Sequence, residues 1–167
     1  MPKKKPYKKP PLRNFNLKSR GPHYKDQDSS LPHAIISDLD GTLAILHDRS
    51  PYDCVACGSD KLNEPVADIL KTYATIGITI ILFSGREEKS REETIKWLKR
   101  HEVPFNLLEM RADGDLRKDN IVKKDMYENH VKGKYFIKFV LDDRNQVVDL
   151  WRLDLGLPCL QVNYGNF

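Results

Sequence analysis

The 167-residue chain has little cysteine and no long apolar segment. Its three cysteines are few for this length and odd in number, which argues against a disulfide framework. No stretch offers the roughly 18 consecutive apolar residues that a membrane-spanning helix needs, and the N-terminus has no apolar signal core. We therefore expect a cytoplasmic protein that does not associate with membranes.

Acidic residues are scarce at the N-terminus, where positive charge accumulates. Residues 1–33 contain nine Lys and Arg but only two Asp, a net charge of +7, which leaves −3 for residues 34–167. The segment is also rich in Pro and poor in periodic apolar residues, so it cannot bury enough surface to offset the entropy of ordering. We predict a flexible basic tail over 1–33 and one folded domain over 34–167. The positive field of the tail suits a nucleic acid, although a merely solubilising tail has the same composition.

The rest of the chain alternates between apolar runs typical of buried strands and segments with apolar residues at helical spacing. This alternation predicts an α/β fold of three layers, Rossmann-like, with a five-stranded parallel sheet. Ligands in such sheets bind beyond the carboxyl ends of the strands. The expected strands are 33–40, 78–85, 105–111, 135–143 and 159–163, and the expected helices are 63–77, 90–103, 117–131 and 144–156.

Carboxylates, hydroxyls and basic groups gather where the expected strands end and helices begin, and neither His nor Cys is among them. Acids clustered without a metal would repel one another, and oxygen ligands of this kind suit Mg²⁺. Hydroxyl and ammonium groups suit phosphate oxygens, so the set predicts a phosphoryl-transfer site with an aspartate as nucleophile. The residues are Asp38, Asp40, Thr42, Ser84, Gly85, Arg86, Lys118, Asp142 and Asp143.

Four of these motifs, in their order along the chain, resemble those of the haloacid dehalogenase superfamily of phosphatases. They are Asp38-Leu39-Asp40-Gly41-Thr42, Ser84, Lys118 and the "VLDD" sequence that ends in Asp142-Asp143. The blocks "DLDGTLAILHDRSPYD", "SGREE", "RADGDLRKDNIVKKDMYENHV" and "LDDRNQVVDLWRLDLGLPCLQV" resemble more narrowly the 3′-phosphatase domain of polynucleotide kinase/phosphatases, the bacteriophage enzyme above all. The resemblance covers nearly all of 34–167, and a phage-encoded protein would act in the host cytoplasm.

The resemblance implies a role for each acid. Asp38 would attack the 3′-phosphate to form an aspartyl-phosphate, and Asp40 would act as the general acid and base. Mg²⁺ would be held by Asp38, the backbone carbonyl of Asp40, Asp142 and Asp143.

The same resemblance implies roles for the other site residues. Thr42 and Ser84, with the adjacent Gly85, would bind phosphate oxygens, and Lys118 would balance the charge of nucleophile and phosphate. Arg49 and Arg86 would grip the substrate, since a guanidinium can hold phosphate at two points.

These features predict a Mg²⁺-dependent polynucleotide 3′-phosphatase that acts on DNA or RNA ends during repair. Only a short segment, 43–62, separates the first motif from the first helix, so we expect a minimal flap that leaves the cleft open to a polymer. No kinase motif lies in the chain, so a kinase or ligase would act as a separate partner. A nucleotidase for free mononucleotides and a nucleic-acid-binding accessory protein are the alternatives. The sequence also leaves a 2′,3′-cyclic phosphodiesterase side activity open.

Overall fold

The computed structural model describes residues 25–45 and 57–165. Within these ranges the chain forms seven strands, four α-helices, two 3₁₀ turns and one π-helical segment. In chain order these are β1 (His33–Asp38), β2 (Ala44–Ile45), the 3₁₀ turn Cys57–Ser59, β3 (Lys61–Leu62), α1 (Glu64–Thr75), β4 (Thr79–Glu87), the 3₁₀ turn Glu88–Ser90, α2 (Arg91–Arg100), β5 (Leu107–Arg111), α3 (Asp119–His130), β6 (Phe136–Arg144), α4 (Asn145–Asp149), the π-helical segment Leu150–Asp154 and β7 (Cys159–Gly165).

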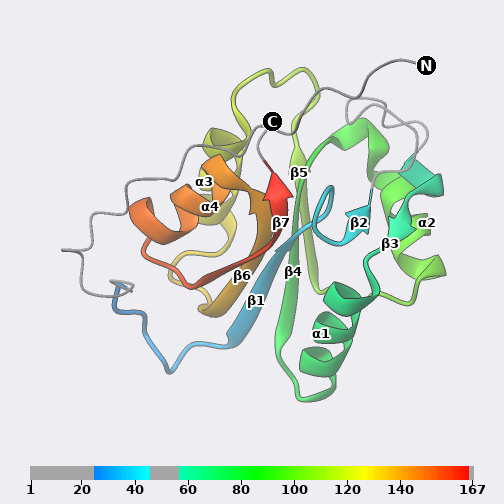
Figure 1. Ribbon diagram of the computed structural model, residues 1–167. Coiled ribbons are helices and arrows are strands. Elements are labelled where there is room, and N and C mark those ends of the chain that lie inside the picture. The colour runs from blue at the N-terminus through cyan, green and yellow to red at the C-terminus, as the bar shows by residue number, and fades with distance from the viewer. Residues whose placement is uncertain (1–24, 46–56, 166–167) are drawn as a thin grey trace, which may run out of the picture.

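Five of the strands form one parallel sheet in the order β5-β4-β1-β6-β7. Helices α1 and α2 cover one face of this sheet, and α3 and α4 cover the other (Figure 1). The prediction of a three-layer α/β fold with a five-stranded parallel sheet is confirmed. Because β1 lies at the centre, the residues at its carboxyl end have neighbouring strand ends on both sides.

Two apolar cores lie on opposite faces of the sheet, because successive side chains of a strand point in opposite directions. In β1, Ile36 packs into the core that α3 and α4 cover, whereas Ile35 packs into the core beneath α1 and α2. Trp151 and Trp97 are fully buried, one in each core.

Asn63 links the start of α1 to the turn that follows β1. Asn63 does occupy the N-cap position, but it makes no side-chain cap. Its amide instead donates to the carbonyl oxygen of Thr42 at 2.7 Å, and its backbone N–H donates to the carbonyl of Leu43. Asn63 therefore fastens the beginning of α1 to the chain that leaves β1.

The two-stranded pairing of β2 with β3 marks the base of the predicted flap. Ala44 lies opposite Leu62, and Ile45 lies opposite Lys61. The intervening residues 46–56 lie outside the described part of the chain. The two short strands thus bring the two ends of this segment together.

Residues of the segment just before β1, which were assigned to the predicted tail, make contacts with the folded domain. The side chain of Gln27 pairs with both backbone groups of Ile137, at 2.9 and 2.7 Å, and the N–H of Lys25 donates to the carbonyl of Gly156. Strand β1 already begins at His33. These bonds hold Gln27 against the beginning of β6 and Lys25 against Gly156. Residues 1–24 lie outside the described part.

Within the described ranges, no helix is both long and apolar enough to cross a membrane.

Candidate active site

Three aspartates meet where the two central strands end. Asp38 is the last residue of β1, and Asp142 and Asp143 lie near the end of the neighbouring β6. One carboxylate oxygen from each lies within 4.8 Å of the others, and all three residues are buried. This group fits a metal ion with hard oxygen ligands. Asp38, Asp142 and Asp143 were all predicted to lie together, and the structure brings them together.

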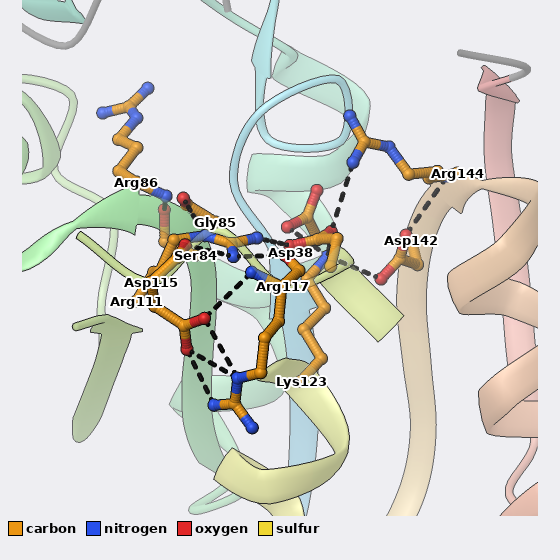
Figure 2. A network of polar contacts seen from close by, with 11 residues as sticks. Asp38, Ser84, Gly85, Arg86, Arg111, Asp115, Arg117, Lys123, Asp142 and Arg144 are labelled. Atoms are coloured by element: carbon orange, nitrogen blue, oxygen red, sulfur yellow. Dashed lines mark hydrogen bonds and ion pairs between the residues drawn. The ribbon is translucent and has the colours of Figure 1, made fainter. Parts of the chain in front are cut away.

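A buried lysine lies against this acidic group. The ammonium of Lys123 contacts Asp38 at 2.7 Å, Asp142 at 3.1 Å and Asp119 at 3.3 Å (Figure 2). Lys123 lies on α3, one turn after Asp119, with its side chain only 2% exposed. We predicted Lys118 for the position next to the nucleophile, but that place belongs to Lys123. Lys118 precedes α3, is exposed, and lines the mouth of the pocket described below.

Trp151 fixes Asp142 from the core side. Its indole N–H donates to Oδ2 of Asp142 at 3.1 Å, and the backbone N–H of Arg144 donates to Oδ1 at 3.2 Å. Trp151 lies in the π-helical segment that follows α4. Such π-helical turns are frequent at functional sites. Asp142 is therefore held by Lys123, Trp151 and the backbone, and its orientation is set before any ligand binds.

Gly41 is required by the close approach of Asp143. It has a φ of +90°, and a Cβ atom there would lie 2.4 Å from Oδ2 of Asp143. The next residue, Thr42, donates its hydroxyl to Oδ1 of Asp143 at 3.4 Å. Thr42 is fully buried in this position. The turn after β1 thus supports Asp143, whereas the predicted contact of Thr42 with phosphate stays a prediction.

The carboxylates of this group carry more negative charge than their surroundings neutralise. Burial raises the pKa of Asp38 well above its usual value, with Lys123 opposing the shift and Asp142 adding to it. Burial and the charge of Asp142 likewise raise the pKa of Asp143 to about 6. Burial alone would lower the pKa of Lys123, but the carboxylates around it outweigh burial and raise the pKa. A bound cation would supply the missing positive charge.

Asp40 is held by a buried arginine. Arg86 donates from Nε to Oδ2 of Asp40 at 2.8 Å and from Nη2 to Oδ1 at 2.7 Å, and it also donates to Asp60 at 2.9 Å and to Thr94 at 3.2 Å. The side chain of Arg86 is fully buried. We predicted Arg86 as a substrate clamp. The structure instead gives it the place of a positioning residue, because its guanidinium is occupied by Asp40, Asp60 and Thr94.

Ser84 and Gly85 lie beside Asp38 on the neighbouring strand β4. Ser84 is fully buried, and its hydroxyl accepts a bond from the N–H of Arg86 at 3.1 Å. At Gly85 a Cβ atom would lie 2.9 Å from Oδ1 of Asp119, so a side chain would push Asp119 away. Both residues lie where they were predicted to lie. Their contact with phosphate stays a prediction.

Arg111 connects the site to the loop between β5 and α3. It donates to the carbonyl of Gly85 at 3.0 Å and to Oδ1 of Asp119 at 3.0 Å. Its Nη1 also donates to the carbonyls of Asp115 and Arg117, at 3.0 and 2.8 Å (Figure 2). Burial raises the pKa of Asp119, but Lys123 and Arg144 outweigh burial, so that the net pKa is lowered. Asp119 thus remains a carboxylate between Arg111 and Lys123.

A pocket of about 430 Å³ opens above this group. Its inner wall is acidic and its mouth is mostly basic. Asp40 lines it with one fifth of its side chain exposed, so this carboxylate can meet a ligand while Arg86 holds it. Arg49, the other predicted clamp, lies outside the described residues. The lining residues include Asp38, Asp40, Gly85, Lys89, Arg111, Leu116, Arg117, Lys118, Asp119, Asp143 and Arg144.

Sequence reasoning missed Lys123, Asp119, Asp60 and Arg111, although two of them left a signal. Lys123 lies between the apolar Val122 and Met126 on the buried face of α3, and a lysine among core positions requires a buried partner. Arg111 ends a strand of the parallel sheet, so the rule applied to the other strand ends also selects it. Asp60 follows a segment without regular periodicity and gave no comparable signal.

Comparison with known proteins adds the family to this geometry. A family model of the phosphatase domain of the polynucleotide kinase PNKP matches residues 32–167. The chain belongs to this family of phosphatase domains. The resemblance inferred from the sequence motifs is thereby confirmed, and the sheet with its acidic strand ends is that of a haloacid dehalogenase-type phosphatase.

The similar proteins are larger than this chain. A protein of the Autographa californica nuclear polyhedrosis virus, described as a bifunctional polynucleotide kinase/RNA ligase, is 33% identical over 158 residues, which are 93% of this chain and 22% of that protein. Two solved chains from structures of a Pnkp1/Rnl/Hen1 complex, one called an RNA repair complex, are 51% and 52% identical with TM-scores of 0.88. The match covers 90% of this chain and 52% and 49% of those chains.

A class C acid phosphatase from Bacillus anthracis has the same fold at 18% identity, with a TM-score of 0.57 over 82% of this chain and 68% of its own.

Proposed function

We propose that this protein is a Mg²⁺-dependent polynucleotide 3′-phosphatase that prepares RNA or DNA ends for repair. The observation that carries the proposal is the contact of Asp38 with Lys123 beside Asp142 and Asp143, at the inner wall of an open pocket. An aspartate at that place can act as a nucleophile, and the basic side chains at the mouth suit a phosphorylated polymer. Membership of the family supports the choice of a polynucleotide end.

The reaction has two steps at one phosphorus. A carboxylate oxygen of Asp38 attacks the 3′-phosphate, the bond from phosphorus to O3′ breaks, and Asp40 donates a proton to the leaving O3′. Asp40 then takes a proton from a water molecule that attacks the aspartyl-phosphate, which releases phosphate and restores both aspartates. Arg86 fixes the direction of the Asp40 carboxyl group through both of its oxygens. Lys123 offsets the charge that approaches Asp38.

The donor set fits Mg²⁺, because it contains carboxylate oxygens without nitrogen or sulfur. Asp38, Asp142 and Asp143 would hold the ion. When bound, Mg²⁺ would neutralise phosphate charge and align the phosphoryl group with Asp38. The backbone carbonyl of Asp40 was predicted as a further ligand and remains part of this proposal.

The proposed setting is RNA repair with a kinase or ligase as partner. It rests on the similar proteins, one described as a kinase/RNA ligase and two from a complex that includes Rnl and Hen1. The basic N-terminal segment is proposed to contact the nucleic acid, because residues 1–24 contain eight Lys and Arg and no acidic residue. Deletion of 1–24 should lower the affinity for an oligonucleotide and flatten its salt dependence, whereas unchanged binding would exclude the segment as a contact.

The proposal is tested with oligonucleotides that carry a 3′-phosphate, as DNA and as RNA, single-stranded and duplex. We expect release of inorganic phosphate with Mg²⁺ and none with EDTA. Turnover of 3′-mononucleotides at an equal kcat/KM would favour the mononucleotidase alternative. Binding without any phosphate release under all conditions would favour the accessory protein.

A further inference from the structure

One side of the pocket mouth presents an apolar side chain. Leu116, in the loop between β5 and α3, is 94% exposed and lines the pocket. A single exposed leucine is ordinary on a protein surface. This one differs because it stands beside the candidate phosphate site, where every other described lining residue is polar, charged or glycine.

The loop holds Leu116 in place from both sides. Arg111 donates to the carbonyl of Asp115 and to the carbonyl of Arg117, the two neighbours of Leu116. Arg117 also donates its backbone N–H and its guanidinium to the carboxylate of Asp115 (Figure 2). At the far end of the loop, the N–H of Lys89 donates to Asp113 at 2.9 Å. The backbone that carries Leu116 is therefore ordered before a ligand arrives, which lowers the cost of binding against it.

Two residues of the same loop, Arg117 and Lys118, carry positive charge. Arg117 is committed to Asp115 at 2.7 Å and to Asp125 at 2.8 Å. Lys118 lines the pocket and has no ion-pair partner within the described ranges. An exposed ammonium next to an exposed apolar side chain matches the chemistry of a nucleotide, which offers a phosphate and an apolar base face side by side.

We propose that the β5–α3 loop, residues 112–118, receives the 3′-terminal nucleotide, with Leu116 packed against its base and Lys118 at the adjacent internucleotide phosphate. The inference rests on the proposed function, because it places the scissile phosphate at Asp38. Contact with a base face is independent of base identity, so the loop recognises the presence of a nucleobase and not its sequence.

The test compares two 3′-phosphorylated DNA oligonucleotides, one ending in a normal nucleotide and one ending in a tetrahydrofuran residue that lacks a base. For Leu116→Ala we expect kcat/KM on the normal substrate to fall about 5-fold through KM, as for the loss of a modest apolar contact. For wild-type protein, kcat/KM should fall by about the same factor when the terminal base is missing. On that substrate, Leu116→Ala should have the same kcat/KM as wild-type protein. Leu116→Met should retain wild-type values.

Leu153 provides the matched control, because it is 76% exposed and does not line the pocket. Leu153→Ala should leave all constants unchanged. An equal loss for Leu116→Ala on both substrates, or no loss on either, would overturn the inference.

A second readout separates this inference from the proposed function. Dissociation constants of the same oligonucleotides are measured by fluorescence anisotropy with Asp38→Asn and with the double variant Asp38→Asn/Leu116→Ala. If the terminal base strengthens binding to Asp38→Asn but not to the double variant, the role of Leu116 is supported. If the base does not strengthen binding to Asp38→Asn, or strengthens binding to both variants equally, that role is refuted. Wild-type protein that binds both oligonucleotides but releases no phosphate from them or from 3′-phosphorylated RNA would refute the proposed function instead.

Discussion

The inner wall and the mouth of the pocket are built in opposite ways. At the inner wall, charged side chains are buried and held by several partners each, as Lys123 is by Asp38, Asp119 and Asp142. At the mouth, Leu116 and Lys118 are exposed and make few side-chain contacts, while the backbone beneath them is fixed by Arg111. The difference indicates that the inner wall is organised for chemistry and the mouth for recognition. Changes at the two places should therefore affect different constants.

The largest effect is expected for Asp38→Asn. The amide is a poor nucleophile, so phosphate release should fall by about 10³-fold or more. The fold should persist, because the change keeps the shape of the side chain. Phosphate release under Mg²⁺ and the melting temperature are measured together. Asp68→Asn on the exposed face of α1 is the control, and activity retained in Asp38→Asn would contradict the role of this residue.

Removal of Lys123 should damage both chemistry and stability. In Lys123→Met three buried carboxylates lose their shared cation, and breaking buried ion pairs typically costs about 3–5 kcal/mol. We expect a clearly lower melting temperature, at least 10²-fold less activity by an order-of-magnitude estimate, and a larger stabilisation by added Mg²⁺ than in wild type. Lys124, exposed on the same helix, is the control for a change of Lys to Met. A variant as stable as wild type without Mg²⁺ would mean that the buried contacts contribute little.

Arg86→Gln separates a positioning role from a clamp. Because Arg86 holds both oxygens of Asp40, we expect kcat to fall by about 10²-fold, with KM changed little. Steady-state kinetics on a 3′-phosphorylated oligonucleotide measures the two constants separately. A rise in KM at constant kcat would instead support the role of Arg86 in gripping the substrate that was predicted from the sequence.

The smallest effect is expected at the mouth. Lys118→Ala should weaken oligonucleotide binding a few-fold and reduce the slope of log K against log salt by about one, with kcat unchanged. Fluorescence anisotropy at several salt concentrations measures the slope. Lys99→Ala on α2, outside the pocket, should leave the slope as it is. A lower kcat in Lys118→Ala would mean that this residue takes part in the reaction and not only in binding.

The sequence predicted the fold and the acids well, for a physical reason. Strand ends of a parallel sheet converge, so short motifs such as Asp38–Asp40 and Asp142-Asp143 can be placed from periodicity alone. The basic side chains that contact these acids were harder to predict, because the contact depends on the direction of each side chain in the folded protein. Lys118 and Lys123 are five residues apart at the start of one helix, and only the burial of Lys123 distinguishes them.

Arg86 was misjudged for a related reason. The sequence shows an arginine at a strand end, but it does not show whether the side chain points toward the substrate or into the protein. Its buried partner, Asp60, lies in a segment without a regular pattern. The contacts of the segment before β1 could not be anticipated, because Gln27 gives no periodic signal, although its side-chain bonds to Ile137 hold the chain against β6.

The proposed mechanism depends most directly on Asp38 as the nucleophile at the buried inner wall of the pocket. The decisive measurement is mass spectrometry of peptides from protein quenched with acid during turnover of a 3′-phosphorylated oligonucleotide. We predict that one phosphoryl group is found on the peptide containing Asp38, and that it is absent in Asp38→Asn. A phosphoryl group on another residue, or steady turnover by Asp38→Asn, would contradict the account.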